Sequence, residues 1–177
     1  MNEPRFLPLV CPECSADLVG RAEDRAAYCR PCGLAFRCDQ GRIEAIPVAR
    51  VTALPGGDGP LIYLPFWLDG PSVMPAFHSS RPLTLARIAA RLLGAWRAEK
   101  TLSEPPPLGA RLDPARLGEV ARLAKIDLPS PRAPLALLAV PARNEASRFR
   151  LPAFDGFLYD EDVTEREALL QEILQLR

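Results

Sequence analysis

Residues 11–33 read CPECSADLVGRAEDRAAYCRPCG and contain four of the five cysteines of the chain. The four form two CxxC pairs, Cys11 with Cys14 and Cys29 with Cys32, with fourteen residues between the pairs. A CxxC turn brings two thiolates to a common ion, and a second such turn completes a tetrahedral shell of four sulfurs. The spacing therefore predicts one metal site near the N-terminus.

These two turns, CPEC and CRPCG, each lead into a short predicted strand, and the segment resembles a zinc ribbon. The resemblance covers roughly residues 8–48 and implies a structural Zn²⁺ ion held by the four cysteines. It implies no catalytic role, because four thiolates leave no coordination position open for water or substrate. Gly33 follows the second pair, where a residue that tolerates positive φ lets backbone amides turn toward the sulfurs.

Two other interpretations of the cysteines remain. A rubredoxin-like iron site uses the same four-thiolate geometry, but it needs a dense aromatic core, and this segment offers only Phe6, Tyr28 and Phe36. A disulfide framework is disfavoured in a chain without a secretory signal. Cys38, the fifth cysteine, shares one face of an extended strand with Phe36 and Leu34, which favours a buried apolar role over a reactive thiol.

The composition is that of a globular protein, with 177 residues, 48% hydrophobic and 25% charged. The 22 basic and 22 acidic side chains cancel, so no global field attracts nucleic acid or an anionic membrane. The longest aliphatic run, 135–140, is far shorter than the ~18 residues of a membrane-spanning helix. We therefore expect a cytoplasmic protein without membrane insertion, and the bias toward arginine over lysine favours a bacterial source.

The sequence patterns over the whole chain predict the α+β fold class. We expect a zinc ribbon over residues 1–50, a glycine- and proline-rich linker over 51–60, and a proline-rich α+β domain over 61–177. Asp113 is expected to be an N-cap with Pro114 in the first turn of its helix. In the second domain the patterns predict strands over 61–68, 72–77, 135–140 and 149–154, and helices over 84–98, 114–125 and 164–176.

The two halves of this domain contain a similar sequence pattern at an offset of 76 to 77 residues. LIYLP at 61–65 precedes PAF at 75–77, and LLAVP at 137–141 precedes PAF at 152–154. This repeat predicts a duplicated ββα unit that forms one four-stranded sheet with helices on a face. Chance repetition is the alternative in a chain with 20 prolines.

Catalytic motifs are missing from the sequence. His78 is the single histidine and lies beside two serines, but no third member of a triad is identified, so we interpret it as a solvated loop residue. The chain contains no phosphate-binding glycine loop, Rossmann fingerprint or HExxH motif. We therefore expect no enzyme activity and identify no catalytic residue and no small-molecule substrate.

The candidate interaction surface consists of Tyr63, Phe66 and Trp67 together with Arg87 and Arg91. It predicts a non-enzymatic zinc-binding adapter or accessory subunit that contacts other protein subunits, unless the three rings simply form the core. A zinc-ribbon protein that binds nucleic acid is the alternative, because residues 81–125 carry nine basic and four acidic side chains. Four thiolates on a divalent ion would add about two negative charges to the ribbon and oppose that role.

Overall fold

The structure is a computed structural model, and everything said of it below refers to the residues that it describes. The predicted helix over 164–176 and the second PAF sequence lie outside them. The described residues are 9–21, 23–39, 41–52, 54–79, 81–92, 96–99, 107, 109–124, 134–145, 148–151 and 157–159.

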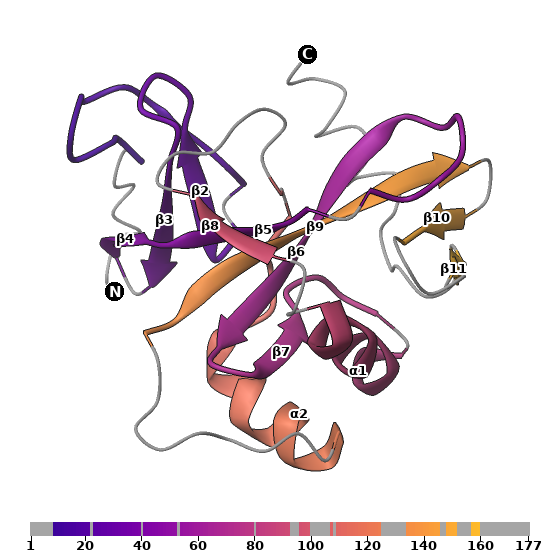
Figure 1. Cartoon of the computed structure of the whole chain (residues 1–177). Coiled ribbons are helices and arrows are strands. Elements are labelled where there is room, and N and C mark those ends of the chain that lie inside the picture. Colours follow the sequence, from indigo (N-terminus) through magenta and orange to yellow (C-terminus); the bar gives the residue numbers. More distant parts are fainter. Residues whose placement is uncertain are drawn as a thin grey trace.

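Two sheets and two helices make up this part of the chain (Figure 1). The smaller sheet is antiparallel and contains β1 (Leu18–Val19), β2 (Ala26–Cys29), β3 (Leu34–Asp39) and β4 (Arg42–Ile46) in that order. The larger sheet contains β5 (Val48–Val51), β6 (Leu61–Asp69), β7 (Ser72–Pro75), β8 (Trp96–Glu99), β9 (Ala136–Glu145), β10 (Arg148–Arg150) and β11 (Phe157–Tyr159). The helices are α1 (Pro82–Leu92) and α2 (Leu117–Ala124), and the 3₁₀ turn η2 (Pro114–Arg116) precedes α2. The α+β class is confirmed.

The chain passes from one sheet to the other at Pro47. β5 pairs parallel with β9 and antiparallel with β8, so the larger sheet begins before residue 51. Residues 57–60 then pack against β9, where the Asn144 amide donates to the Pro60 carbonyl at 3.0 Å. A Cβ on Gly59 would lie 2.1 Å from the Asn144 carbonyl oxygen, so only glycine fits there. The division of the chain into two domains and a linker stays a prediction.

The strand registers agree with the predicted repeat, but the sheet that contains its strands has seven strands rather than the predicted four. The duplication itself stays a prediction. In the β6–β7 hairpin Trp67 lies opposite Met74, and in the β9–β10 hairpin Arg143 lies opposite Arg150, at positions 76 residues later. The same offset carries Leu64 onto Val140, and these two residues face each other in the antiparallel β6–β9 pair. The strands β7, β6, β9 and β10 are therefore arranged about a local twofold axis, as two copies of one hairpin would be.

One predicted strand boundary is wrong. Pro141 was expected to end a strand over 135–140, but β9 continues to Glu145. On one side Pro141 lies opposite Tyr63 of β6. On the other side it falls between residues 137–139, which pair with β5, and residues 143–145, which pair with β10. The amide hydrogen that proline lacks is not needed in this gap.

The first predicted helix is too long. α1 ends at Leu92 rather than at residue 98, because Trp96–Glu99 form β8 and pair with β5. Gly94 and the aromatic Trp96 reduce helix propensity, and strand pairing with a distant segment decides the outcome. Within the described residues neither helix is long and apolar enough to cross a membrane.

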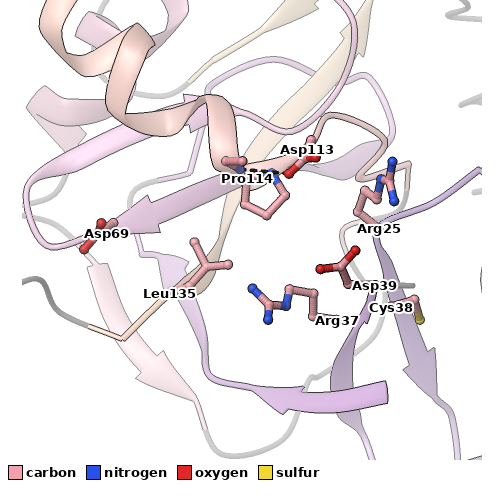
Figure 2. A pocket seen from close by; sticks show the side chains of 9 residues that line it. Arg25, Arg37, Cys38, Asp39, Asp69, Asp113, Pro114 and Leu135 are labelled. Atoms are coloured by element: carbon pink, nitrogen blue, oxygen red, sulfur yellow. Dashed lines mark hydrogen bonds between the residues drawn. The ribbon is translucent and has the colours of Figure 1, made fainter. Parts of the chain in front are cut away.

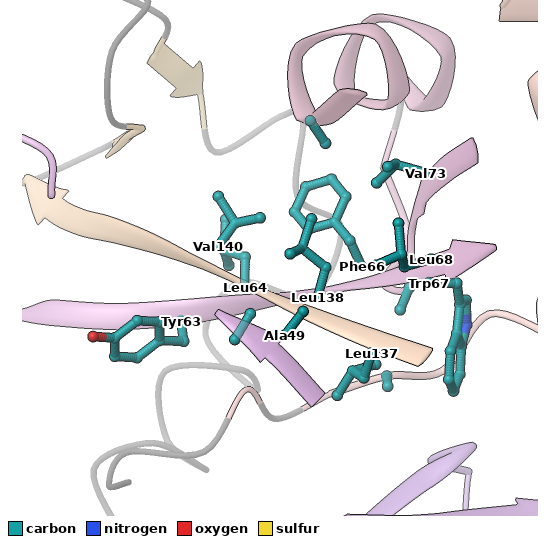
Figure 3. Packing of buried hydrophobic residues seen from close by; sticks show 14 of the residues in the cluster. Ala49, Tyr63, Leu64, Phe66, Trp67, Leu68, Val73, Leu137, Leu138 and Val140 are labelled. Carbon is teal, nitrogen blue, oxygen red and sulfur yellow. The ribbon is translucent and has the colours of Figure 1, made fainter. Parts of the chain in front are cut away.

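The aromatic part of the predicted contact surface is corrected. Phe66 and Trp67 are 1% and 0% exposed and Tyr63 is 8% exposed, because β6 has neighbours on both sides. Figure 3 shows Phe66 and Trp67 on opposite sides of the strand, each among buried side chains. The Phe66 ring meets Phe77 edge to face at 5.6 Å, and the Arg50 guanidinium lies 3.9 Å from the centroid of the Tyr63 ring. These rings belong to the core.

The predicted N-cap of the second helix is confirmed. The Asp113 carboxylate accepts a hydrogen bond from the Ala115 amide at 2.9 Å, with Pro114 in the first turn. We expect Asp113→Ala to lower the unfolding free energy by about 1 kcal/mol, because that amide loses its acceptor. Urea unfolding followed by circular dichroism would measure the change, and an unchanged midpoint would contradict the capping role.

Candidate metal centre

The two CxxC turns have the same backbone geometry. The amide of Ser15 donates to the Cys11 carbonyl at 2.8 Å, and the amide of Gly33 donates to the Cys29 carbonyl at 2.7 Å. Ser15 and Gly33 both have positive φ, 61° and 64°. The expectation for Gly33 is confirmed. The positive φ of Ser15 was not predictable from its residue type, because serine rarely adopts this conformation.

The turns bring the four sulfur atoms together. All four Sγ atoms lie within 4.8 Å of one another. Cys14 and Cys29 are 3.4 Å apart, and Cys11 and Cys32 are 4.0 Å apart. A tetrahedron with metal–sulfur bonds of about 2.3 Å has sulfur–sulfur distances of about 3.8 Å, which lies between these two values. A disulfide needs about 2.05 Å, so the cysteines are free thiols placed to share one ion.

The electrostatics of the cluster favour a bound cation. Burial opposes ionisation of Cys11, but hydrogen bonds from the amides of Cys14 and Glu13 lower its pKa from 9.0 to about 7. Burial raises the pKa of the Cys29 thiol. The Cys14 thiol, followed by burial, raises the pKa of Cys32. One thiolate therefore forms readily while its neighbours resist a second negative charge, and a divalent cation would offset that repulsion.

The two CxxC turns belong to one side of the smaller sheet. Alternate residues of β2 point to opposite faces, so Ala27 and Cys29 pack with Cys11, Leu18 and Phe36 beside the sulfurs. Leu34 and Cys38 pack against the same cluster, which confirms that they share a face with Phe36. Cys38 is half-buried, and burial raises the pKa of its thiol. It is not among the four clustered cysteines.

The other face of the smaller sheet packs on the larger one. Ala26, Tyr28 and Ala35 join the core that contains Trp67 and Leu137. The two CxxC turns and the larger sheet thus lie on opposite sides of β2, and β2 connects the metal site to the main core.

A bridging segment, defined as Pro107 and residues 109–112, ties the two sheets together. On the smaller sheet the Tyr28 hydroxyl donates to the Pro107 carbonyl, and the Arg25 amide donates to the Ala110 carbonyl at 2.6 Å. On the larger sheet the Trp67 indole donates to the Leu112 carbonyl at 2.7 Å. No pattern in the sequence predicts the role of this segment, because the residues before it are rich in proline and show no helix or strand periodicity.

An ion pair reinforces the same junction. Arg111 of the bridging segment lies 3.4 Å from the Asp24 carboxylate, which also accepts from the Arg21 amide at 2.9 Å. Asp24 is buried, and this burial raises its pKa above the ordinary 3.8 despite the hydrogen bond from the Arg21 amide and the charge of Arg111. Folding therefore favours its protonated form, so the stability that Asp24 contributes is largest at low pH and is lost as the pH rises through the raised pKa.

The raised pKa of Asp24 predicts that a substitution at this position changes the stability of the protein in a pH-dependent way. Asp24→Asn stays neutral and keeps an acceptor for the Arg21 amide, so its unfolding free energy relative to wild type should grow as the pH rises above 3.8. Urea unfolding at several pH values at which zinc stays bound would measure the difference. Asp58→Asn, at an exposed loop position, is the control and should follow wild type. A constant difference between Asp24→Asn and wild type would contradict the prediction.

A cavity of about 260 Å³ lies at the junction between the sheets (Figure 2). Its lining combines two arginines with three aspartates, so charges of both signs face the same space. Asp113 of this lining already caps η2, and Arg37 pairs with Glu44 at 3.0 Å. The described residues that line it are Arg25, Arg37, Cys38, Asp39, Asp69, Asp113, Pro114, Ala115 and Leu135.

The remaining predicted site residues lie elsewhere. His78 is exposed in the loop between β7 and α1 and does not line the cavity. The neighbouring Ser79 hydroxyl accepts from the Arg81 amide at 3.0 Å, just before α1. Arg87 and Arg91 are exposed on α1, far along the chain from the cysteines. The structure therefore brings together the four cysteines, and separates them from the other candidates.

Comparisons with known proteins add no relative. No protein-family model matches the chain, and the searches of curated proteins and of solved structures gave no match.

Proposed function

We propose that the chain binds one structural Zn²⁺ ion through Cys11, Cys14, Cys29 and Cys32 and serves as a non-enzymatic adapter or accessory subunit in a larger cytoplasmic assembly. The observation that carries the metal proposal is the pair of sulfur–sulfur distances, 3.4 and 4.0 Å, which bracket the value for a tetrahedral four-sulfur shell. Such a shell has no position for a reactant, so the ion organises the fold.

Zinc is favoured over iron by the surroundings of the sulfurs. Phe36 is the aromatic side chain in the described cluster beside the metal site. Tyr28, the other described aromatic of this segment, belongs to the opposite face and to the main core. A rubredoxin-like iron centre would need more rings around its sulfurs, and a closed Cys₄ site of this kind is typical of structural zinc.

The adapter role is supported by the contacts that attach the smaller sheet, which carries the cysteine cluster, to the larger sheet. The bridging segment and Asp24 hold the smaller sheet against the larger one, so zinc would stabilise a scaffold built from both sheets. Exposed His78 has no described partner in a catalytic arrangement, which favours a binding role over catalysis. Other protein subunits are the proposed partners.

Affinity purification from the native host, with and without nuclease, tests the adapter role. We expect protein partners that remain in stoichiometric amounts after nuclease treatment. Recovery that is abolished by nuclease and depends steeply on salt would instead favour a nucleic-acid-binding protein. Cys38→Ser is a useful bait control, because it alters the ribbon without touching the four clustered sulfurs.

A further inference from the structure

The two helices form a continuous layer on the larger sheet. Both α1 and α2 contact β7, and they contact each other (Figure 1). The Arg87 side chain of α1 donates to the carbonyl of Ala124, the last residue of α2, at 3.2 Å. Arg91 lies one turn beyond Arg87 on α1, and Arg122 lies in the turn of α2 that Arg87 reaches. Arg87 thus joins the two helices close to the turns that carry Arg91 and Arg122.

The surface of these two helices has a strong local excess of positive charge. In the described residues 81–92 and 114–124, Glu119 is the single acidic side chain. Favourable interactions with helix C-termini explain part of the pattern, since Arg91 and Arg122 lie in last turns. The interaction with a helix C-terminus uses the positive charge of Arg91 and Arg122, but a guanidinium has five N–H donors and most of them stay available to a ligand. The basic side chains here are Arg81, Arg87, Arg91, Arg116 and Arg122, and all five are exposed.

An exposed apolar residue lies next to one of these arginines. Leu123 is 47% exposed and follows Arg122 directly in the sequence. Only Val10 and Leu54 among the described large hydrophobic residues share such exposure. Arginines around an exposed apolar residue are typical of protein interfaces, where the apolar group is buried and the charges form the rim.

We propose that this α1–α2 surface binds an acidic segment of a partner protein, with Arg91 and Arg122 pairing its carboxylates and Leu123 contacting an apolar side chain of that segment. Arginine suits this role, because its planar guanidinium binds a carboxylate through two parallel hydrogen bonds. The inference names the partner class for the proposed adapter and rests on that proposed function.

The same observations disfavour nucleic acid as the occupant. Nucleic-acid affinity grows with the number of phosphates that basic side chains neutralise, and the described residues of these helices and their flanks offer five arginines. The exposed apolar side chain of Leu123 has no role in binding a phosphate backbone. The described residues of the two helices include no aromatic side chain on which a base could stack.

A random peptide library displayed on phage, selected against the zinc-loaded full chain, tests the proposal. We expect the selected peptides to be rich in Asp and Glu and to share an apolar position. The best peptide is then synthesised with a fluorophore and titrated by anisotropy. Arg91→Gln with Arg122→Gln should weaken binding about tenfold, and Leu123→Ser should weaken it about fivefold. Arg87 is left intact because it contacts the end of α2.

Arg42→Gln, at an exposed position of β4, is the matched control and should leave the peptide affinity unchanged. Absence of selected peptides, selection of peptides without acidic residues, or equal binding to the double variant would overturn the proposal. Tighter binding of a short DNA duplex, lost in the double variant, would assign the surface to nucleic acid instead. Zinc content is measured in every sample, and a negative result with full zinc content would reject this surface without rejecting the adapter role.

Discussion

Cys29→Ser should lose stoichiometric zinc and leave the smaller sheet unfolded. Cys29 is 1% exposed and supplies both a clustered sulfur and the carbonyl that accepts from Gly33. Structural zinc in small modules contributes an apparent ~10–16 kcal/mol, which is as large as the ~5–15 kcal/mol net stability of a whole domain. Four short strands with a small core cannot replace that contribution. Zinc analysis, circular dichroism and limited proteolysis would measure the loss, and EDTA should reproduce it in wild type.

Cys38→Ser provides the matched control for this experiment. It changes a half-buried cysteine of the same sheet, but its sulfur is not among the four that cluster. It should retain one zinc ion per chain and the protease resistance of wild type. A Cys29→Ser protein that kept its zinc and its fold, or a wild type unaffected after EDTA had removed the metal, would refute the metal-dependent fold.

Trp67→Ala should destabilise the larger sheet more than any surface change. The side chain is fully buried in the core shared by the two sheets, and truncation of such a ring costs about 3–5 kcal/mol. The Leu112 carbonyl also loses its indole donor, which adds about 1 kcal/mol. Trp67→Phe loses the hydrogen bond and the smaller part of the ring system, so its cost should be clearly below that of Trp67→Ala. Urea unfolding of the zinc-loaded proteins would measure both variants.

Leu54→Ala is the control for Trp67→Ala, because Leu54 is 59% exposed and its truncation should change stability by at most ~0.5 kcal/mol. Zinc content should stay at one ion per chain in Trp67→Ala, since the sulfurs lie in a separate cluster on the other face of β2. Equal stability of Trp67→Ala and Leu54→Ala would contradict the described core.

The parts of the fold that the sequence predicted correctly depend on local chemistry. The two CxxC turns carry their own geometry, and the four sulfur atoms cluster once the turns meet. Asp113 and Pro114 mark the start of η2, which leads directly into α2. The β6–β7 hairpin was predictable for the same reason, whereas the internal duplication stays a prediction with which the equal registers agree.

The errors concern features that distant strand pairing decides. Tyr63, Phe66 and Trp67 look exposed beside a proline and a turn, and they become core only because β9, more than 60 residues later, pairs along β6. Strand β8 replaces the end of the predicted helix for the same reason, since its partner is β5. No local pattern in the sequence reveals such partners.

The four thiolates of the two CxxC turns are proposed to hold one zinc ion in a closed shell. Elemental analysis of the purified chain combined with X-ray absorption at the zinc edge tests this proposal most directly. We predict one zinc ion per chain with four sulfur neighbours at about 2.3 Å and no oxygen or nitrogen neighbour. The absence of stoichiometric zinc, or a shell with fewer than four sulfurs, would contradict the claim.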